Sequence, residues 1–241
     1  EYCRIKLYIP LVMDKEIYNS ALYSLIIQLI IGVICIGGLF IELDKEDRVL
    51  NEILLLESIV QFIEFSFYLW LVFNFSNITT NVTLIRYFDW FITTPTMLFS
   101  IISFMIYYGN KLNNISNEYL TLSSIYNSHT SIINNVVALN AIMLLTGFLG
   151  ELGKIGKSIG FIVGTICLSV CYYLIYSNFV NDIFANKIVF WFNFIIWSLY
   201  GITYLMPYTN KNIFYNILDI FSKNINGLMI FALILYTKYS M

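Results

Sequence analysis

A lysine and an aspartate lie one helical turn apart in a long apolar run near the C-terminus. The run reads NILDIFSKNINGLMIFALIL and contains Asp219 and Lys223. Side chains at this spacing share one face of a helix, and the lysine leans back toward the aspartate. A neutral lysine amine is a nucleophile that forms a Schiff base with an aldehyde. The protonated product would be a buried cation, so this chemistry needs a counter-ion.

A second apolar run carries an acid that could serve as that counter-ion. Its sequence RYFDWFITTP places Arg86 and Asp89 on one face of a helix, one turn apart. Thr93 follows one turn after Asp89, and we expect its hydroxyl to donate a hydrogen bond to the Asp89 carboxylate. Pro95 removes a backbone donor, so we expect a kink at this point.

A third run, WFNFIIWSLYGITYL, carries an aromatic face. Trp197, Tyr200 and Tyr204 recur at helical spacing, so their rings share one side of a helix. Such a stripe is usually core packing. Opposite a buried lysine and two aspartates, it also provides the wall that a long conjugated ligand needs.

The composition predicts that a membrane holds these elements in place. Of the 241 residues, 59% are hydrophobic and 12% are charged, whereas a soluble domain carries about 25% charge. This excludes an ordinary cytosolic enzyme and a disordered tail, and the net charge of −2 offers no basic surface for nucleic acid. Three of the four cysteines lie in apolar runs, and with a single histidine we expect no metal site.

Seven apolar runs are long enough to span a bilayer, for which about 20 residues suffice. The polar stretch 109–130 is the one long connection between them, and it could form a short helix at the membrane interface. We therefore predict an all-α, seven-transmembrane-helix bundle that forms one domain over residues 1–241. The predicted spans are 18–40, 49–75, 84–108, 131–153, 158–180, 187–207 and 212–237.

The segments RYFDWFITTP and DIFSK resemble microbial (type 1) rhodopsins, with support from LNAIMLLTGFLGEL and WSLYGITYL. The resemblance runs from about residue 20 to residue 237 and implies all-trans retinal held covalently by Lys223. It implies Asp89 as primary counter-ion and proton acceptor, and Asp219 as second counter-ion. It also implies an N-terminus outside the membrane. The implied retinal pocket contains Tyr68, Trp90, Thr93, Thr94, Asn140, Met143, Gly147, Trp197, Tyr200 and Tyr204.

Among the departures of the chain from the proton pumps of that family, two concern groups that carry protons. Pumps keep a carboxylic acid on the cytoplasmic side of the third span, and Ser100 stands at that position. A serine cannot store a proton, so we expect no internal proton donor. The glutamates of an outward release group are missing before the last span, which reads MPYTNKN.

Polar residues along the spans suggest an ion pathway instead, because carboxylates and amides can line a hydrated cation route. ESIVQFIEF and YNILDIFSKN resemble the first group of viral rhodopsins, from large DNA viruses of algae and protists, whose members are light-gated cation channels. We expect substitution of Glu57 or Glu64 to change conductance more than colour. The proposed pathway contains Ser24, Glu57, Glu64, Arg86, Asn216 and Asn224.

The leading prediction is thus a light-gated channel for monovalent cations and protons, without enzymatic activity. It would be a multi-pass protein in contact with lipid, in the host cell membrane if the chain is viral, and a homo-oligomer is also considered. The alternatives are a light-driven outward proton pump, a photosensor that signals through a partner helix, and a retinal-free transporter. For Glu57 and Glu64, the alternative is a structural role or contact with lipid headgroups.

Overall fold

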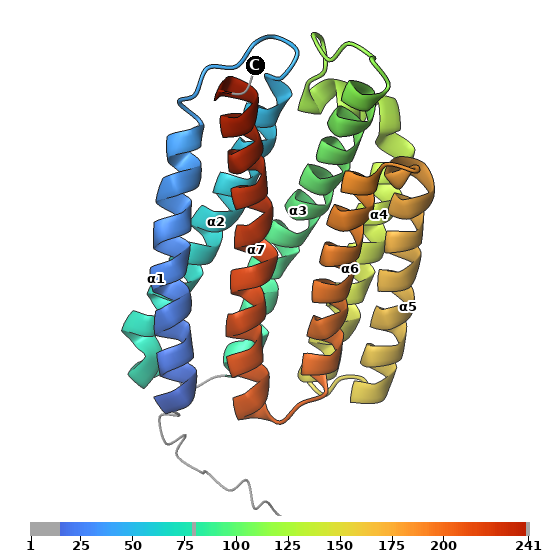
Figure 1. The fold of residues 1–241 in the computed structure, drawn as a ribbon. Helices are drawn as coiled ribbons and strands as arrows, with labels where there is room; N and C mark the ends of the chain where they lie inside the picture. Colours follow the sequence, from blue (N-terminus) through green and yellow to red (C-terminus); the bar gives the residue numbers. More distant parts are fainter. Residues whose placement is uncertain (1–14, 79–80, 240–241) are drawn as a thin grey trace, which may run out of the picture.

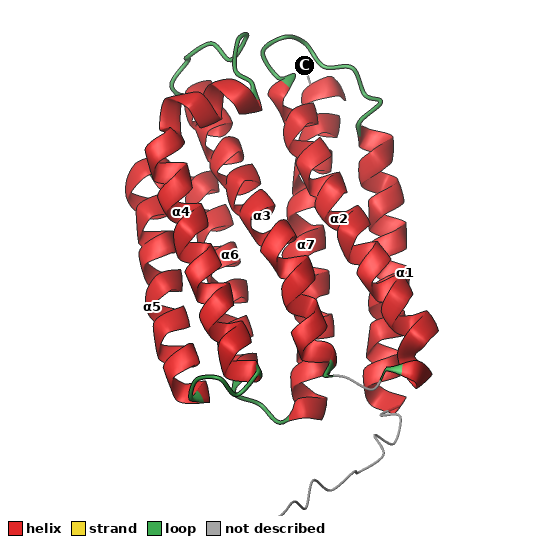
Figure 2. Ribbon diagram, turned by 180° about the vertical axis from the view of Figure 1, so that it is seen from behind, coloured by secondary structure: helices red, strands yellow, loops and turns green. Residues whose placement is uncertain are grey.

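The computed structural model describes residues 15–78 and 81–239. Within these ranges seven α-helices run alternately up and down in one bundle, without a strand (Figures 1 and 2), so the all-α prediction is confirmed. A 3-10 turn, Phe75–Asn77, follows α2, and a π-helical turn, Tyr176–Val180, follows α5. The helices are α1 Lys15–Gly38, α2 Val49–Asn74, α3 Val82–Leu112, α4 Leu122–Glu151, α5 Lys157–Ile175, α6 Phe184–Tyr204 and α7 Tyr208–Tyr239.

The outer surface of the bundle is apolar. Large hydrophobic side chains such as Phe62 and Phe73 are mostly exposed. All of the helices except α6 are long and apolar enough, together with the short turns that follow α2 and α5, to cross a membrane. α6 is 21 residues long and packs in the same bundle. A belt of exposed apolar side chains around long helices is the surface that a bilayer requires.

The largest difference from the predicted spans is the start of α4. Thr121 and Ser124 form a reciprocal capping box, which satisfies free backbone groups at the helix start. α4 therefore begins at Leu122, and a kink at His129 separates its first two turns from the rest. The polar stretch after α3 is consequently mostly helical, and only residues 113–121 form the connection. α3 also continues through Pro95 to Leu112 without a break.

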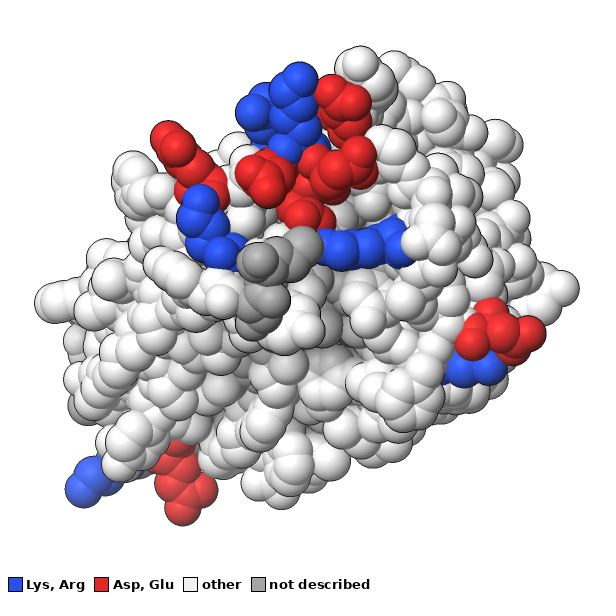
Figure 3. All heavy atoms as spheres, turned by 45° about the horizontal axis from the view of Figure 1, so that its top comes forward, with Lys and Arg blue, Asp and Glu red and all other residues white. Residues whose placement is uncertain are grey.

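Charged side chains gather at the upper end of the bundle, which holds the loops 39–48 and 113–121 (Figure 3). Asp47 accepts hydrogen bonds from the Tyr107 hydroxyl and from Lys111 Nζ, the latter at 2.7 Å. Lys45 pairs with Glu118 across the two loops, at 3.2 Å. The Asp47 contacts fix the first loop to α3, and the Lys45–Glu118 pair links the two loops.

α7 is the element that positions the site, because it packs against α1, α2, α3 and α6. Figure 1 shows it at the front of the bundle, with α1 and α2 on one side and α6 on the other. Its middle carries Asp219 and Lys223, both fully or almost fully buried. Side chains from four helices can therefore reach them.

Candidate functional site

The Lys223 ammonium lies at the centre of the bundle among three carboxylates from three helices. Its Nζ donates to Glu64 Oε2 of α2 and to Asp89 Oδ2 of α3, the latter at 2.8 Å. Asp219 Oδ1 of α7 lies 3.4 Å from the same nitrogen. All four side chains are buried. Charges so far from water are stable only when they are paired, so this cluster holds its members together.

Asp219 joins this cluster to a second cation. Arg86 NH1 lies 3.1 Å from Asp219 Oδ2, and both side chains are fully buried. Tyr68 and Tyr200 each donate a hydroxyl hydrogen bond to Asp219, at 2.8 and 2.7 Å. Together, Lys223 and Arg86 face three acids, so the cluster is neutral only when one of its carboxyl groups holds a proton.

Two sequence expectations change at this cluster. The Thr93 hydroxyl donates to the backbone carbonyl of Asp89 at 3.1 Å and not to its carboxylate, because the one-turn spacing favours the backbone acceptor. Arg86, which shares a face of α3 with Asp89, pairs with Asp219 of α7. Glu64 contacts the lysine nitrogen directly, so its substitution should change the electrostatics of this nitrogen as well as any ion pathway.

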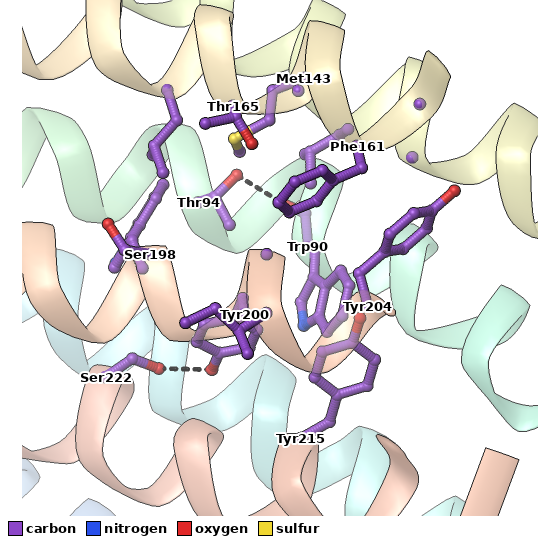
Figure 4. Close-up of a pocket in the computed structure, with 18 of the residues that line it drawn as sticks. Trp90, Thr94, Met143, Phe161, Thr165, Ser198, Tyr200, Tyr204, Tyr215 and Ser222 are labelled. Carbon is purple, nitrogen blue, oxygen red and sulfur yellow. Dashed lines mark hydrogen bonds between the residues drawn. The ribbon is translucent and has the colours of Figure 1, made fainter. Parts of the chain in front are cut away.

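A cavity of about 320 Å³ lies between α3, α4, α5, α6 and α7, beside this cluster. The rings of Trp90, Tyr200 and Tyr215 form one wall of the cavity (Figure 4). Trp90 packs edge-on against both tyrosines, at centroid distances of 5.6 and 4.9 Å. The residues expected at a pocket that do line this cavity are Trp90, Thr94, Met143, Gly147, Trp197, Tyr200 and Tyr204.

The other three expected pocket residues lie outside the cavity wall. Tyr68 bonds Asp219, and Asn140 donates to the Thr94 hydroxyl at 2.7 Å, while Thr93 bonds the backbone. Sequence reasoning missed several lining residues. Tyr215 lies one turn before Asp219 on the same helix, and this spacing could have predicted it. The other missed residues come from helix faces that carry no motif. The missed residues include Tyr87, Phe161, Gly164, Thr165, Ser198, Tyr215 and Ser222.

Two glycines of α4 give tyrosine side chains room at this cavity. A Cβ on Gly147 would lie 2.7 Å from the Tyr87 hydroxyl, and a Cβ on Gly150 would lie 2.0 Å from the Tyr204 hydroxyl. Both distances are shorter than van der Waals contact. Small residues on α4 therefore set the width of the cavity at the lower end of the bundle.

The lysine lies near one end of the cavity. Ser222, its neighbour in the chain, lines the cavity, as do Trp90 and Tyr200, and Tyr200 also bonds Asp219 beside the lysine nitrogen. Ligand pockets of small molecules have volumes of about 300–1,000 Å³ and mostly apolar walls. The aromatic wall, the volume and the adjacent amine fit a long conjugated aldehyde that reacts with Lys223.

Buried polar side chains from α1, α2 and α7 form a row, called here the polar file, that runs from Ser24 and Asn216 below the lysine cluster toward the upper end. Ser24 Oγ donates to the Asn216 carbonyl oxygen at 2.9 Å, and Gln61 Nε2 lies 3.4 Å from Cys35 Sγ. Buried polar atoms are normally satisfied by protein or by ordered water. Several atoms of this file have no hydrogen-bond partner among the described residues. They are both amide atoms of Gln28, Glu57 Oε2, Gln61 Oε1, Glu64 Oε1 and Asn224 Oδ1.

Comparison with known proteins identifies relatives of this fold. The sequence model of the bacteriorhodopsin-like protein family matches residues 20–237. The viral rhodopsin OLPVRII is 26% identical, with 90% of this chain and 96% of that chain covered and a TM-score of 0.77. The blue light-absorbing proteorhodopsin from Med12 is 21% identical, with 92% and 98% covered and a TM-score of 0.71. The proton pumping rhodopsin AR2 from the marine alga Acetabularia acetabulum is 17% identical, with 94% and 97% covered and a TM-score of 0.70. Comparison with curated proteins gives no match.

Proposed function

Because this chain belongs to the bacteriorhodopsin-like protein family, we propose that it is a light-gated cation channel with retinal bound covalently at Lys223. Family membership makes it a multi-pass integral membrane protein and not an enzyme, as the sequence predicted. The observation that carries the channel proposal is the buried polar file, which includes Glu64, the side chain in contact with Lys223.

In this proposal, Lys223, the three acids around it and Arg86 have separate roles. Bound retinal would supply light absorption and a light-driven change of shape at the Lys223 nitrogen. Asp89, Asp219 and Glu64 stabilise positive charge on that nitrogen. Asp89 also stands at the distance of a proton acceptor, 2.8 Å. Arg86 holds Asp219 in place from the lower half of the bundle.

The polar file offers a route for cations between α1, α2 and α7. Carboxylates and side-chain amides replace part of the hydration shell of an ion in such pathways. Glu64, Gln61 and Glu57 lie on one face of α2 and are all buried, while Ser24 and Asn216 close the file below the cluster. A displacement at the lysine nitrogen would reach this route through Glu64 first.

A light-driven outward proton pump is the second candidate, and one contact favours it. Glu57 of α2 bonds Ser100 of α3, so a buried carboxyl lies at the position where a pump needs one. The two functions differ in their current. A channel current reverses with the cation gradient, whereas a pump current does not, so photocurrents recorded over a range of voltages in retinal-loaded cells test the proposal.

Replacing Asp89 with asparagine should shift the visible absorption band to longer wavelength. The change removes one of three carboxylates at the Lys223 nitrogen, and a unit charge about 4 Å away contributes about 4 kcal/mol at an effective dielectric constant of 20. The ground state loses more of this stabilisation than the excited state. The measurement is the absorption spectrum at neutral pH, with Thr93→Val as control because Thr93 bonds only the backbone. An unchanged Asp89→Asn spectrum would exclude Asp89 as counter-ion.

Replacing Gly227 with alanine should reduce the photocurrent without changing the absorption maximum. A Cβ at this position would lie 2.5 Å from Gln61 Nε2 and 3.2 Å from Cys35 Sγ, so the Gln61 amide must move within the file. Gly32→Ala of α1 is the matched control, because nothing lies within 4 Å of its added Cβ. Equal photocurrents per molecule of pigment in the two variants would show that ions do not pass Gln61.

A further inference from the structure

The Glu57 carboxyl of α2 and the Ser100 hydroxyl of α3 are hydrogen-bonded in the upper half of the bundle. Glu57 is fully buried and Ser100 is 2% exposed. The sequence predicted that this level would lack a proton donor, because the α3 position holds a serine. The structure brings a carboxyl to the same place from the neighbouring helix.

The surroundings of Glu57 favour its neutral, protonated form. From α3 it faces the Ser100 hydroxyl, and from α1 the nearby titratable group is the Cys35 thiol, beside Gln61. Among the described residues no lysine, arginine or histidine forms an ion pair with Glu57, and the α7 cation, Lys223, is paired with other carboxylates. A carboxylate buried without a cation is costly, so such a group keeps its proton.

Polar groups connect Glu57 with the lysine cluster. Gln61 follows Glu57 by one turn of α2, and Glu64 follows after a second turn, about 10 Å along the helix axis from Glu57. Glu64 contacts the Lys223 nitrogen. Glu57 Oε2, Gln61 Oε1 and Glu64 Oε1 have no hydrogen-bond partner among the described residues, so each has an oxygen free for a connecting water.

We propose that Glu57 is the internal proton donor of this protein and that the hydrogen bond from Ser100 positions its carboxyl group. The proposal rests on the proposed binding of retinal at Lys223 but applies to a channel and to a pump. In the step, the O–H bond of Glu57 breaks and a proton passes along the hydrated file. An N–H bond forms at the Lys223 nitrogen, and Glu57 becomes a carboxylate. A proton from water at the upper end then restores Glu57.

The first test measures whether Glu57 holds a proton in the dark. An infrared spectrum of the protein, recorded with and without retinal, should contain a carboxylic C=O band that disappears in Glu57→Gln. Ser100→Ala should move this band to higher frequency because the carboxyl loses a hydrogen-bond partner. Ser103→Ala should leave it unchanged, because this buried serine of the same helix donates only to the Phe99 carbonyl oxygen. Absence of the Glu57 band from the wild type would overturn the proposal.

The second test follows the recovery of the visible band after a light flash. In Glu57→Gln we expect recovery to slow about 100-fold, the low end of the contribution of a positioned acid, and to become proportional to the external proton concentration. Azide, a small permeant weak acid, should restore the rate, and Glu57→Asp should retain part of it. Recovery that stays fast and independent of pH in Glu57→Gln would overturn the donor role.

Failure of this proposal and failure of the channel proposal have different signatures. A photocurrent that reverses with the cation gradient, together with unaltered recovery in Glu57→Gln, leaves the channel intact and removes the donor. A current that never reverses, together with slowed and azide-sensitive recovery, removes the channel and retains the donor. A wild type that forms no pigment with retinal removes the shared premise of both.

Discussion

Lys223→Ala protein should have no visible absorption band after incubation with retinal, and no retinal should remain attached after denaturation. Lys223 is the one buried lysine beside the aromatic cavity, since Lys211, the other buried lysine of the described residues, pairs with Glu151 at the lower end of α7. Without the amine no Schiff base can form. Absorption spectroscopy and mass spectrometry of the purified protein measure both effects.

The alanine variant also leaves three acids facing one cation, and removal of one partner from a buried ion pair costs about 3–5 kcal/mol. Lys223→Arg therefore accompanies it, because a guanidinium keeps the positive charge but forms no Schiff base under these conditions. Lys211→Gln is the positive control and should keep the band. A covalent retinal adduct in a folded Lys223→Arg protein would refute the assignment.

Glu64→Gln should change both colour and current, which no other single substitution in the file is expected to do. Glu64 Oε2 contacts the Lys223 nitrogen, and its Oε1 is open to the polar file. Replacing the carboxyl group changes the electrostatics at the nitrogen, so the absorption band should shift, and the file loses an acid that can attract cations. A loss of about 1.4 kcal/mol lowers cation occupancy about tenfold, so we expect a photocurrent per pigment smaller by about that factor.

Glu52→Gln is the matched control for this prediction. Glu52 belongs to the first turn of the same helix, where its carboxylate accepts a hydrogen bond from the Leu122 backbone N–H at 2.8 Å. A glutamine oxygen can accept the same bond, so colour and current should stay near the wild type. A Glu64→Gln protein that behaves like this control would leave Glu64 with a structural role only.

The sequence was sufficient for the family, the number of helices and the central pair in α7. Long apolar runs identify membrane helices well. In lipid, a single segment can satisfy all of its backbone hydrogen bonds only as a helix. The spacing of Asp219 and Lys223 is enough to predict that they are neighbours, because residues one turn apart in a helix share a face. α4 begins at Leu122, before the predicted span, because a capping box at Thr121 starts the helix there. Its first two turns, up to the kink at His129, are the short helix that the sequence allowed in the polar stretch.

Contacts between helices could not be predicted from the sequence. Spacing along α2 shows that Glu57 and Glu64 share a face, but not which neighbours they meet. Packing places Glu64 at the nitrogen of Lys223 and Glu57 at the hydroxyl of Ser100. The same limit explains why Ser100, taken alone, indicated a missing proton donor.

The direction of the photocurrent tests the central claim most directly. It is recorded in retinal-loaded cells over a range of voltages, with sodium, potassium or protons as the varied gradient. A light-gated cation channel predicts a current that changes sign, with a reversal potential that moves by up to about 59 mV for each tenfold change in the permeant cation. A light-induced current that stays outward at every voltage and in every gradient would contradict the account.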